Sequence, residues 1–246
     1  MVNRLEAQII ALEPVLLERP LISVVIPTLN EEDGIVCALS ELSLSGLKEN
    51  GFGTEIIVVD GNSNDDTVER AEKFGARVVV ENRLGYGLAY KTGFTVSRGE
   101  FLVALDGDHS YPASIVPKLV EIMVKENMDF ITTNRLAGLE PDAMHPIHRV
   151  GNWILSTAVR LLFSVRIVDS QSGMWAIRKK ALQKILPKSD GMAFSQEIKI
   201  RAFKSCKCLE IPIQYRKRIG NPKIRTMLDG FKNLIHLVQL KLSTVS

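Results

Sequence analysis

Apolar segments alternate with amphipathic ones through the first half of the chain, and this alternation constrains the possible folds most. The apolar segments are short and rich in Val, Ile and Leu, and they are residues 21–28, 55–59, 76–80, 101–105 and 128–134. Most of the segments between them, such as residues 66–74 and 112–126, have helical features. Strands that alternate with helices predict a mostly parallel sheet with helices on both faces. The predicted fold class is therefore α/β.

The apolar segment 101–105 is continuous and does not alternate with polar residues, which predicts a strand covered on both faces. Asp106 and Asp108 follow it directly, with Gly107 between them. One interpretation is a tight turn, which Asp and Gly favour. The other is a divalent-cation site, because hard cations prefer carboxylate oxygens and often keep a substrate phosphate as a further ligand. The two aspartates alone leave both interpretations open.

Polar residues stand at the carboxyl ends of three predicted strands, at residues 28–31, 60–66 and 106–108. In open α/β sheets, ligands lie off the carboxyl ends of the strands, where the connecting loops converge. This convergence favours a binding site over a plain turn. Asn30 is in addition a candidate N-cap, because acidic residues follow it in the first turn of the next predicted helix.

Length and charge limit the functional classes. A chain of 246 residues can bury one sizeable core, and a net charge of +3 is too small to indicate a nucleic-acid partner, so none is expected. The basic residues nevertheless crowd one late segment, which favours acidic partners. They are Lys199, Arg201, Lys204, Lys207, Arg216, Lys217, Arg218, Lys223 and Arg225. Three cysteines without a C-x-x-C pair predict reduced thiols in a cytosolic setting.

The two ends of the chain lie outside the alternating pattern. Residues 1–20 form an N-terminal extension that does not resemble a signal peptide, and residues 226–246 predict an amphipathic helix. The segment 150–165 is apolar but interrupted by arginine, so it fits either a core helix or a helix at a membrane surface. No segment is long and apolar enough to predict a membrane span, and the chain stops at Ser246, so at most a peripheral association with the membrane is expected.

Several motifs, taken in order, resemble those of a known family. The stretches VVIPTLNEED, EIIVVDGNSNDDT, GYGLAYKTGF and FLVALDGDHSYP are similar to the GT-A glycosyltransferases of family 2. The later stretches DSQSGMWAIRKKAL, GMAFSQEIKIRAF and EIPIQYRKRIGNPKIR resemble the branch that makes dolichyl-phosphate or polyprenyl-phosphate sugars. The ordered set is more specific than any single motif. The resemblance implies a GT-A, Rossmann-like domain over residues 21–225, followed by the C-terminal amphipathic segment, which we expect to associate with the membrane.

The resemblance also implies a metal site and a donor site. Mg²⁺ or Mn²⁺ would be held at Asp106 and Asp108, where it would stabilise the departing diphosphate as a Lewis acid. The third position of the metal site is Ser110, where related enzymes often have Gln. The residues implied for the nucleotide sugar are Pro27, Thr28, Asn30, Glu31, Asp60, Gly85 and Asp106.

A lipid phosphate is already anionic, so as an acceptor it needs cations rather than a general base. The residues implied for its phosphate are Arg135, Arg149, Arg218 and Lys223. Asp106, Asp108 and Arg218 are the implied catalytic residues. Asp169 and Glu197 are further candidates that would order the sugar or an acceptor-site arginine, and helix capping is the alternative for Glu197.

The function implied is transfer of a sugar from a nucleotide sugar to dolichyl or polyprenyl phosphate. A UDP-sugar, with glucose or N-acetylglucosamine, is favoured slightly over GDP-mannose. Two alternatives stay open: a GT-A enzyme with a sugar-hydroxyl acceptor and Asp169 or Glu197 as base, and a non-catalytic nucleotide-sugar-binding protein. We expect a cytoplasmic protein that is peripheral on the cytoplasmic face of the membrane, with a membrane partner subunit as a further open prediction.

Overall fold

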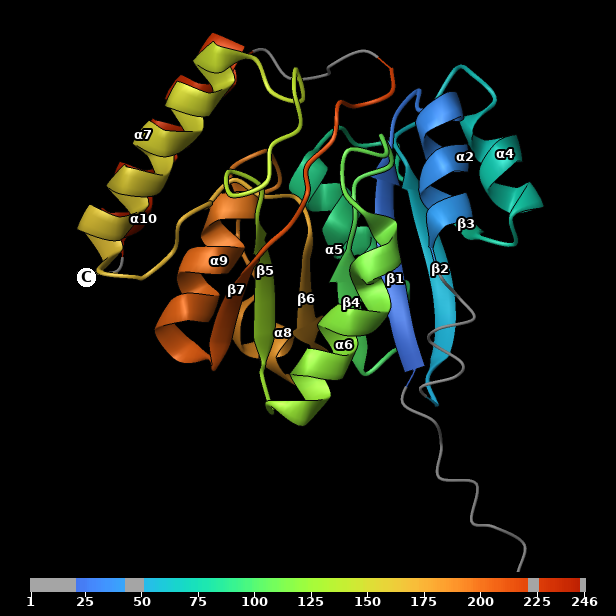
Figure 1. Ribbon diagram of the computed structural model, residues 1–246, viewed down its shortest axis with the longest axis horizontal. Helices are drawn as coiled ribbons and strands as arrows, with labels where there is room; N and C mark the ends of the chain where they lie inside the picture. The colour runs from blue at the N-terminus through green and yellow to red at the C-terminus, as the bar shows by residue number, and fades with distance from the viewer. Residues whose placement is uncertain (1–20, 43–50, 221–225, 244–246) are drawn as a thin grey trace, which may run out of the picture.

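The computed structural model describes residues 21–42, 51–220 and 226–243, and its centre is a seven-stranded sheet (Figure 1). The strand order is β3-β2-β1-β4-β6-β5-β7, and β6 alone among these strands runs antiparallel to its neighbours. The strands are β1 (Leu21–Thr28), β2 (Gly53–Asp60), β3 (Arg77–Val80), β4 (Phe101–Ala104), β5 (Phe130–Asn134), β6 (Trp175–Arg178) and β7 (Cys208–Pro212). The predicted α/β class with a mostly parallel sheet is confirmed.

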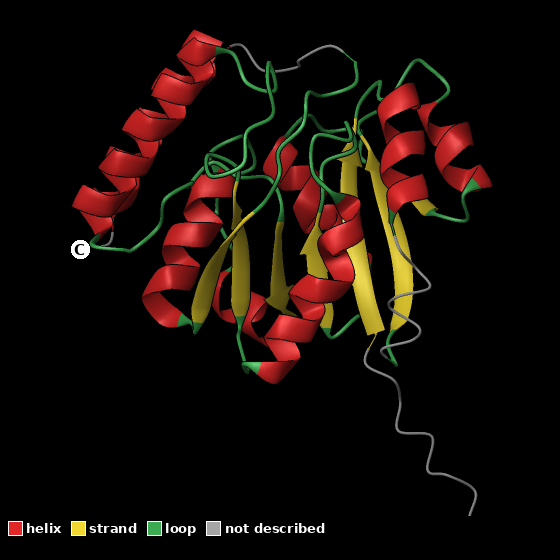
Figure 2. Ribbon diagram, viewed as in Figure 1, coloured by secondary structure: helices red, strands yellow, loops and turns green. Residues whose placement is uncertain are grey.

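Helices cover both faces of this sheet (Figure 2). They are α2 (Glu32–Glu41), α4 (Thr67–Lys73), α5 (Tyr86–Val96), α6 (Val116–Lys125), α7 (Pro146–Phe163), α8 (Lys179–Ile185), α9 (Phe194–Ser205) and α10 (Thr226–Ser243). A short 3₁₀ turn, η1 (Ala113–Ile115), precedes α6. Within the described ranges, no helix has both the length and the apolar character that a membrane span requires.

The alternation of side chains along each strand divides the core into two layers. Val24 and Ile26 of β1 pack with α2, α4 and α6, whereas Val25 packs with α5, α8 and α9. Successive side chains of a strand point to opposite faces, so one strand supplies both layers. The strand β4 is buried at every residue, which confirms the prediction of a strand covered on both faces.

The helices α7 and α10 lie together beside α9 at one end of the sheet (Figure 1). Leu155 and Val159 of α7 meet Leu237 and Leu240 of α10 in a small third cluster, together with Ile200 of α9. This cluster is separate from the two layers on the sheet. The predicted helix at the C-terminus is confirmed for residues 226–243, whereas the predicted N-terminal extension, residues 1–20, lies outside the described residues.

The N-cap prediction for Asn30 is wrong. Helix α2 begins at Glu32 with Glu31 in the cap position, and Asn30 has a left-handed backbone conformation with φ of 51°. Asn tolerates this conformation better than most residues. Its side-chain Oδ1 accepts a hydrogen bond from the backbone N–H of Asn64, 2.8 Å away. Asn30 therefore joins two loops instead of capping its own helix.

Candidate active site

The carboxyl ends of β1 and β2 are joined by hydrogen bonds between their side chains. The Thr28 hydroxyl donates to Asp60 Oδ1 at 3.1 Å, and the Ser63 hydroxyl and backbone N–H also donate to Asp60 at 2.5 and 2.8 Å. The backbone N–H of Asn30 donates in turn to Ser63 Oγ at 2.8 Å. These bonds bring Thr28, Asn30 and Asp60 together at one edge of the sheet. Pro27 precedes Thr28 in β1, at the same edge.

Two tyrosines of α5 hold Asp106 at the end of β4. The Tyr86 hydroxyl donates to Asp106 Oδ1 at 3.0 Å and the Tyr90 hydroxyl at 3.4 Å. Burial and, next, the negative charge of Asp108 raise the pKa of Asp106 to about 6. Both effects disfavour the ionised carboxyl. A cation placed beside these two carboxylates would favour the ionised form, which suits a metal or a cationic side chain.

Asp108 uses its two oxygens differently. Oδ1 accepts from the Ser110 backbone N–H at 3.0 Å and from the Ser110 hydroxyl at 2.5 Å. Oδ2 lies 3.3 Å from Arg218 Nη1. Arg218 Nη2 also donates to Glu31 Oε1 at 2.8 Å, so one guanidinium joins the ends of β1 and β4. Ser110 is fully buried and positions Asp108, while its predicted part as a metal ligand stays a prediction.

Residues 215–220, here called the strap, cross the loop that holds the two aspartates. Two backbone hydrogen bonds join them: Arg216 N–H to the Ser110 carbonyl at 3.0 Å, and Ile219 N–H to the Asp108 carbonyl at 2.9 Å. The Arg216 side chain pairs with both carboxylate oxygens of Glu41 at 2.7 Å. The strap is therefore anchored at α2 and places Arg218 beside Asp108.

The donor set fits a divalent cation that takes substrate oxygens as its remaining ligands. Among the described side chains, no group of three or more His, Cys, Asp or Glu is arranged to hold a metal ion. The chain supplies two neighbouring carboxylates, Asp106 and Asp108, of which Asp108 already binds a positive group through Oδ2. Mg²⁺ and Mn²⁺ accept such oxygen ligands, and Mg²⁺ is commonly bound through one or two carboxylates plus substrate phosphates.

Close backbone packing brings two further segments to Asp106. Gly85 precedes α5, and a Cβ there would collide with the Asp190 carbonyl, so glycine lets α5 present its tyrosines. Gly173, in the loop before β6, lies against the Asp106 carboxylate with no space for a Cβ. The sequence motif DSQSG therefore borders the two-aspartate site.

Arg135 and Asp169 form a buried ion pair. Arg135 Nε and Nη2 donate to the two oxygens of Asp169 at 2.7 and 2.8 Å, and the guanidinium stacks over the Tyr215 ring. Burial acts against the charge of Asp169, yet Arg135 holds the pKa of that carboxyl below its usual range. In the structure, the guanidinium of Arg135 is engaged with Asp169. The predicted phosphate-binding role of Arg135 stays a prediction.

Glu197 holds a loop instead of capping α9. Its carboxylate accepts from the backbone N–H groups of Lys188 and Ser189, both at 3.0 Å, and from Arg201 Nε at 2.7 Å. Burial acts in the opposite direction, but hydrogen bonds to His236, these N–H groups and Arg201 lower the pKa of Glu197 to about 2. Glu197 lies in the first turn of α9, as the capping alternative expects, but its carboxylate bonds N–H groups of the preceding loop.

Three arginines of the basic segment are neutralised within the chain. Arg201, Arg216 and Arg218 pair with glutamates, as described above. Lys199 is fully buried, and its Nζ donates to the Ser172 carbonyl at 2.5 Å and to the Ser195 carbonyl and hydroxyl at 2.9 Å. Its expected place in an exposed basic patch is wrong. Lys199 lies three and four residues after Gln196 and Ser195, so all three share one face of α9. That face is buried.

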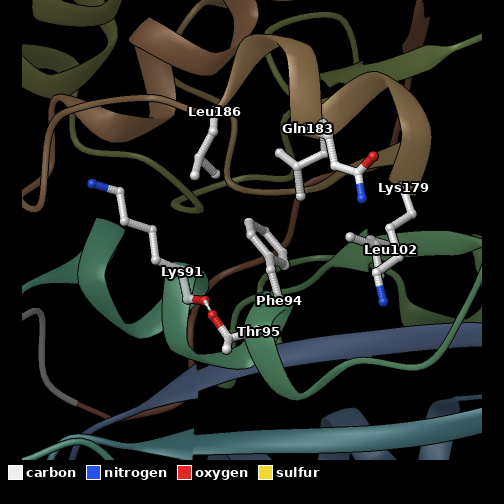
Figure 3. A pocket seen from close by; sticks show the side chains of 8 residues that line it. Lys91, Phe94, Thr95, Leu102, Lys179, Gln183 and Leu186 are labelled. Carbon is white, nitrogen blue, oxygen red and sulfur yellow. Dashed lines mark hydrogen bonds between the residues drawn. The ribbon is translucent and has the colours of Figure 1, made fainter.

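Two other predicted residues, Arg149 and Lys223, are not among the side chains described above. Arg149 is exposed on α7 and lines a hollow of about 360 Å³ with Glu140 and Asp142. Lys223 lies outside the described residues. Figure 3 shows another cavity, of about 310 Å³, between α5 and α8, with Phe94 among its lining residues. None of the predicted site residues lines that cavity, so it is not the candidate site.

Comparisons with known proteins identify relatives of this chain. One relative is the low-salt glycan biosynthesis hexosyltransferase Agl6 of Haloferax volcanii, which is 33% identical over 87% of this chain. Another is the dolichyl-phosphate hexose transferase of the same organism, which is 30% identical. The chain spans 52% of Agl6 but 89% of the second relative, which matches 85% of this chain.

Among solved structures, the glucosyl-3-phosphoglycerate synthase of Mycobacterium tuberculosis, in complex with Mn²⁺, UDP and glucosyl-3-phosphoglycerate, superposes with a TM-score of 0.70. It is 25% identical, and the match covers 92% of this chain and 79% of that one. The model of glycosyl transferase family 2 matches residues 23–186, from β1 through Asp106 and Asp108 to the end of α8. The chain therefore belongs to glycosyl transferase family 2 and is a glycosyltransferase.

Proposed function

We propose that this glycosyltransferase moves a hexose from a nucleoside diphosphate sugar to dolichyl or polyprenyl phosphate. The observation that carries the proposal is that both carboxylates predicted as an alternative general base, Asp169 and Glu197, are engaged by other groups of the chain. Asp169 is in a buried ion pair with Arg135, and Glu197 accepts three hydrogen bonds from a loop and from Arg201. The other alternative, a non-catalytic binding protein, has no support in the comparisons.

An acceptor hydroxyl needs a general base whose pKa lies near the working pH. The pKa of Asp169 is below its usual range and that of Glu197 is about 2, each held down by its positively charged or N–H partners against the effect of burial. Both carboxylates are therefore poor bases. A phosphate acceptor is anionic at neutral pH and requires only cationic positioning, for which Arg218 is available beside Asp108.

In this proposal, Asp106 and Asp108 hold Mg²⁺ or Mn²⁺ against the donor diphosphate. The cation supplies Lewis-acid stabilisation of the leaving group. Thr28, Asn30 and Asp60 form a hydrogen-bonded rim that would take the nucleoside. Tyr86 keeps the Asp106 carboxylate in place through its hydroxyl. Arg218 would orient the acceptor phosphate toward the sugar.

The relatives and neighbours support a lipid-phosphate acceptor and a UDP-sugar donor. One relative is named a dolichyl-phosphate hexose transferase, and another, from Pyrococcus furiosus, a dolichol-phosphate mannosyltransferase. The superposed synthase was solved with UDP-glucose as well as with UDP. We therefore favour UDP-glucose or UDP-N-acetylglucosamine, with GDP-mannose as the competing donor.

A donor and acceptor screen tests the proposal. The protein is incubated with labelled UDP-glucose, UDP-N-acetylglucosamine or GDP-mannose, Mn²⁺ or Mg²⁺, and dolichyl phosphate, and lipid products are separated by extraction. Phosphoglyceric acid and a free sugar replace the lipid in parallel reactions. We expect labelled lipid with one donor. Transfer to phosphoglyceric acid or to the sugar alone would contradict the lipid-phosphate assignment.

Two substitutions separate the acceptor classes. A sugar-hydroxyl mechanism with Glu197 as base predicts that Glu197→Gln abolishes turnover while Arg218→Ala is mild. A lipid-phosphate mechanism predicts the opposite ranking. Lys217→Ala is the matched control, because Lys217 is the exposed neighbour of Arg218 in the strap and should retain activity. Circular dichroism of each variant checks that the fold is intact.

We also propose that the α7–α10 pair rests on an anionic membrane surface. On α7, Trp153 and Leu161 are 60% and 77% exposed, and on α10 Phe231 and Leu242 are 63% and 66% exposed. The predicted apolar stripe of α10 thus faces outward, while Leu237 and Leu240 pack on α7. The sequence of α7 contains arginine and histidine but no acidic residue, which suits anionic headgroups.

Flotation with liposomes tests this attachment. The wild type should float with vesicles that contain anionic lipid, and a Trp153→Ser, Leu161→Ser double variant should float several times less. Leu84→Ser is the control, because Leu84 is 81% exposed but lies far along the chain from both helices, in the loop before α5. If the double variant floated as well as Leu84→Ser, the proposed surface would be contradicted. The prediction of a membrane partner subunit stays untested.

A further inference from the structure

We infer that Arg218 is an internal cation that closes the two-aspartate site and leaves it when the donor and its metal bind, to become the ligand of the acceptor phosphate. The first half of this inference stands on the geometry of the closed site. The second half rests on the proposed lipid-phosphate acceptor. The consequence is an order of binding in which the donor precedes the acceptor.

The guanidinium of Arg218 spans two groups that the site needs for its substrates. Nη1 lies 3.3 Å from Asp108 Oδ2 and Nη2 lies 2.8 Å from Glu31 Oε1. Asp108 and Glu31 are both buried, and the Arg218 side chain is only 24% exposed. Partly buried ion pairs are screened much less by salt than those on the surface. This contact is therefore a real competitor for any cation that approaches Asp108.

The competition is direct because both oxygens of Asp108 are engaged. Oδ1 is held by the Ser110 N–H and hydroxyl, which leaves Oδ2 for a metal, and Oδ2 faces Arg218. A divalent cation and a guanidinium repel each other at this separation. Arg218 must therefore move before a metal can use Oδ2.

The strap is held in place on both sides of Arg218. Arg216 is fixed by two hydrogen bonds to Glu41, and the backbone N–H groups of Arg216 and Ile219 are bonded to the loop of the aspartates. Arg218 lies between these anchors. Its Nε is buried and has no hydrogen-bond partner within the described part of the chain. The closed position thus leaves one strong donor of Arg218 unused.

A phosphate offers what the closed position lacks. Arginine binds phosphate through two parallel N–H bonds, which can include Nε. Once a metal and a diphosphate occupy the carboxylates, Arg218 gains by turning to a second anion. Without a donor, Arg218 stays on Asp108 and Glu31, and the acceptor phosphate meets a neutralised guanidinium. The same residue would thereby link the loading of the donor to the binding of the acceptor.

Metal affinity tests the closed site without any turnover. Binding of Mn²⁺ alone is measured by electron paramagnetic resonance for wild type, Arg218→Gln, Arg218→Lys and Lys217→Gln. We expect Arg218→Gln to bind Mn²⁺ about tenfold more tightly, a usual size for coupling between competing ligands. Lys217→Gln removes the same charge from an exposed position and should match the wild type. Arg218→Lys keeps the cation and should stay within about twofold of it, below the usual range of such coupling.

Equal Mn²⁺ affinity in wild type and Arg218→Gln would overturn the closed site, as would an equal gain in Lys217→Gln. If Arg218→Gln does not fold, Arg218→Met, which keeps an unbranched side chain without the charge, replaces it in the same Mn²⁺ measurement, with the same expected gain. Equal Mn²⁺ affinity in wild type and Arg218→Met would overturn the closed site in the same way.

Acceptor binding tests the order. Farnesyl phosphate is titrated calorimetrically into wild type with and without Mn²⁺ and UDP, below its micelle-forming concentration. We expect binding at least about tenfold tighter when Mn²⁺ and UDP are present, and no such gain in Arg218→Gln. Equal binding in both conditions would overturn the proposed order.

The two failures are distinguishable. If Mn²⁺ affinity does not respond to Arg218→Gln while labelled dolichyl-phosphate sugar is formed, the closed site is wrong and the proposed function survives. If Arg218→Gln tightens Mn²⁺ binding but no lipid phosphate is ever bound or glycosylated, the closed site is supported and the lipid-phosphate acceptor is wrong.

Discussion

The two halves of the sheet hold their functional side chains by different means. At the ends of β1 and β2, Thr28, Asp60 and Ser63 are joined by short hydrogen bonds between neighbours in one network. At the end of β5 and in the loop before β6, the main contact is the buried ion pair of Arg135 and Asp169. The network of Thr28, Asp60 and Ser63 contains one carboxylate and neutral donors, whereas the contact of Arg135 with Asp169 depends on the pairing of full charges.

This difference indicates how each half works. A hydrogen-bonded rim is already arranged before a substrate arrives, so little reorganisation accompanies binding. Ion pairs can exchange partners when a ligand brings charge of its own, as we infer for Arg218. In the proposed function, the donor side is therefore preorganised, whereas the strap beside it responds to what is bound.

The largest effect is expected at Asp108. Asp108→Asn keeps the shape of the side chain and its contact with Ser110 but removes the charge that a metal needs. We expect the transfer rate to fall by about a thousandfold or more, the scale of losing an electrostatic group from an active site. Thermal unfolding should change little. Asp66→Asn is the control in the same half, because Asp66 makes no capping hydrogen bond, and it should keep its activity.

The second prediction concerns the stability of the ion-paired half. Asp169→Asn leaves the buried Arg135 charge uncompensated and should lower the free energy of unfolding by about 3 to 5 kcal/mol in urea titrations. The folded pKa of Asp169 is lowered, so its contribution is present above the unfolded pKa and is lost as pH falls through the folded pKa. The difference in free energy of unfolding between the wild type and Asp169→Asn should therefore shrink in acid. Glu69→Gln, at a fully exposed pair with Lys73, should have no measurable effect.

The third prediction is a dependence of stability on pH. Burial lowers the pKa of Lys199 from 10.5 to about 7, although Asp169 acts in the opposite direction. Between these values the unfolded chain binds more protons than the folded one, so the free energy of unfolding should rise with pH from about 7 toward 10. Lys199→Met should remove this rise, and Lys204→Met, at an exposed position of α9, should keep it. Parallel slopes in all three proteins would contradict it.

The smallest effect is expected at α5. Tyr86→Phe removes a hydrogen bond of 3.0 Å to Asp106, and Tyr90→Phe removes a longer one of 3.4 Å. A hydrogen bond to a charged group is worth enough for about a tenfold loss in kcat/KM for Tyr86→Phe. Tyr90→Phe should cost less. The reverse order would show that the second tyrosine positions Asp106.

The strands and their polar ends could be predicted from the sequence because both follow from local patterns. Apolar runs such as residues 101–105 indicate burial, and parallel strands bring their carboxyl ends to one edge. The partners of Arg135 and Arg218 could not be predicted in this way, since each ion pair joins segments whose separation in the chain carries no periodic signal. The pairing of Glu197 with Arg201, in contrast, follows the i, i+4 spacing of a helix. Arg218 meets Glu31 across 187 positions.

The sequence by itself determined the α/β class, the order of strands and helices through residue 134, and the placing of Asp60, Asp106 and Asp108 at strand ends. Only the tertiary structure decided that Lys199 is buried, that Glu197 holds a loop and that Arg218 lies on Asp108. The physical reason is that side-chain alternation is fixed by local backbone geometry, whereas the partner of a charge depends on which distant segments the core brings together.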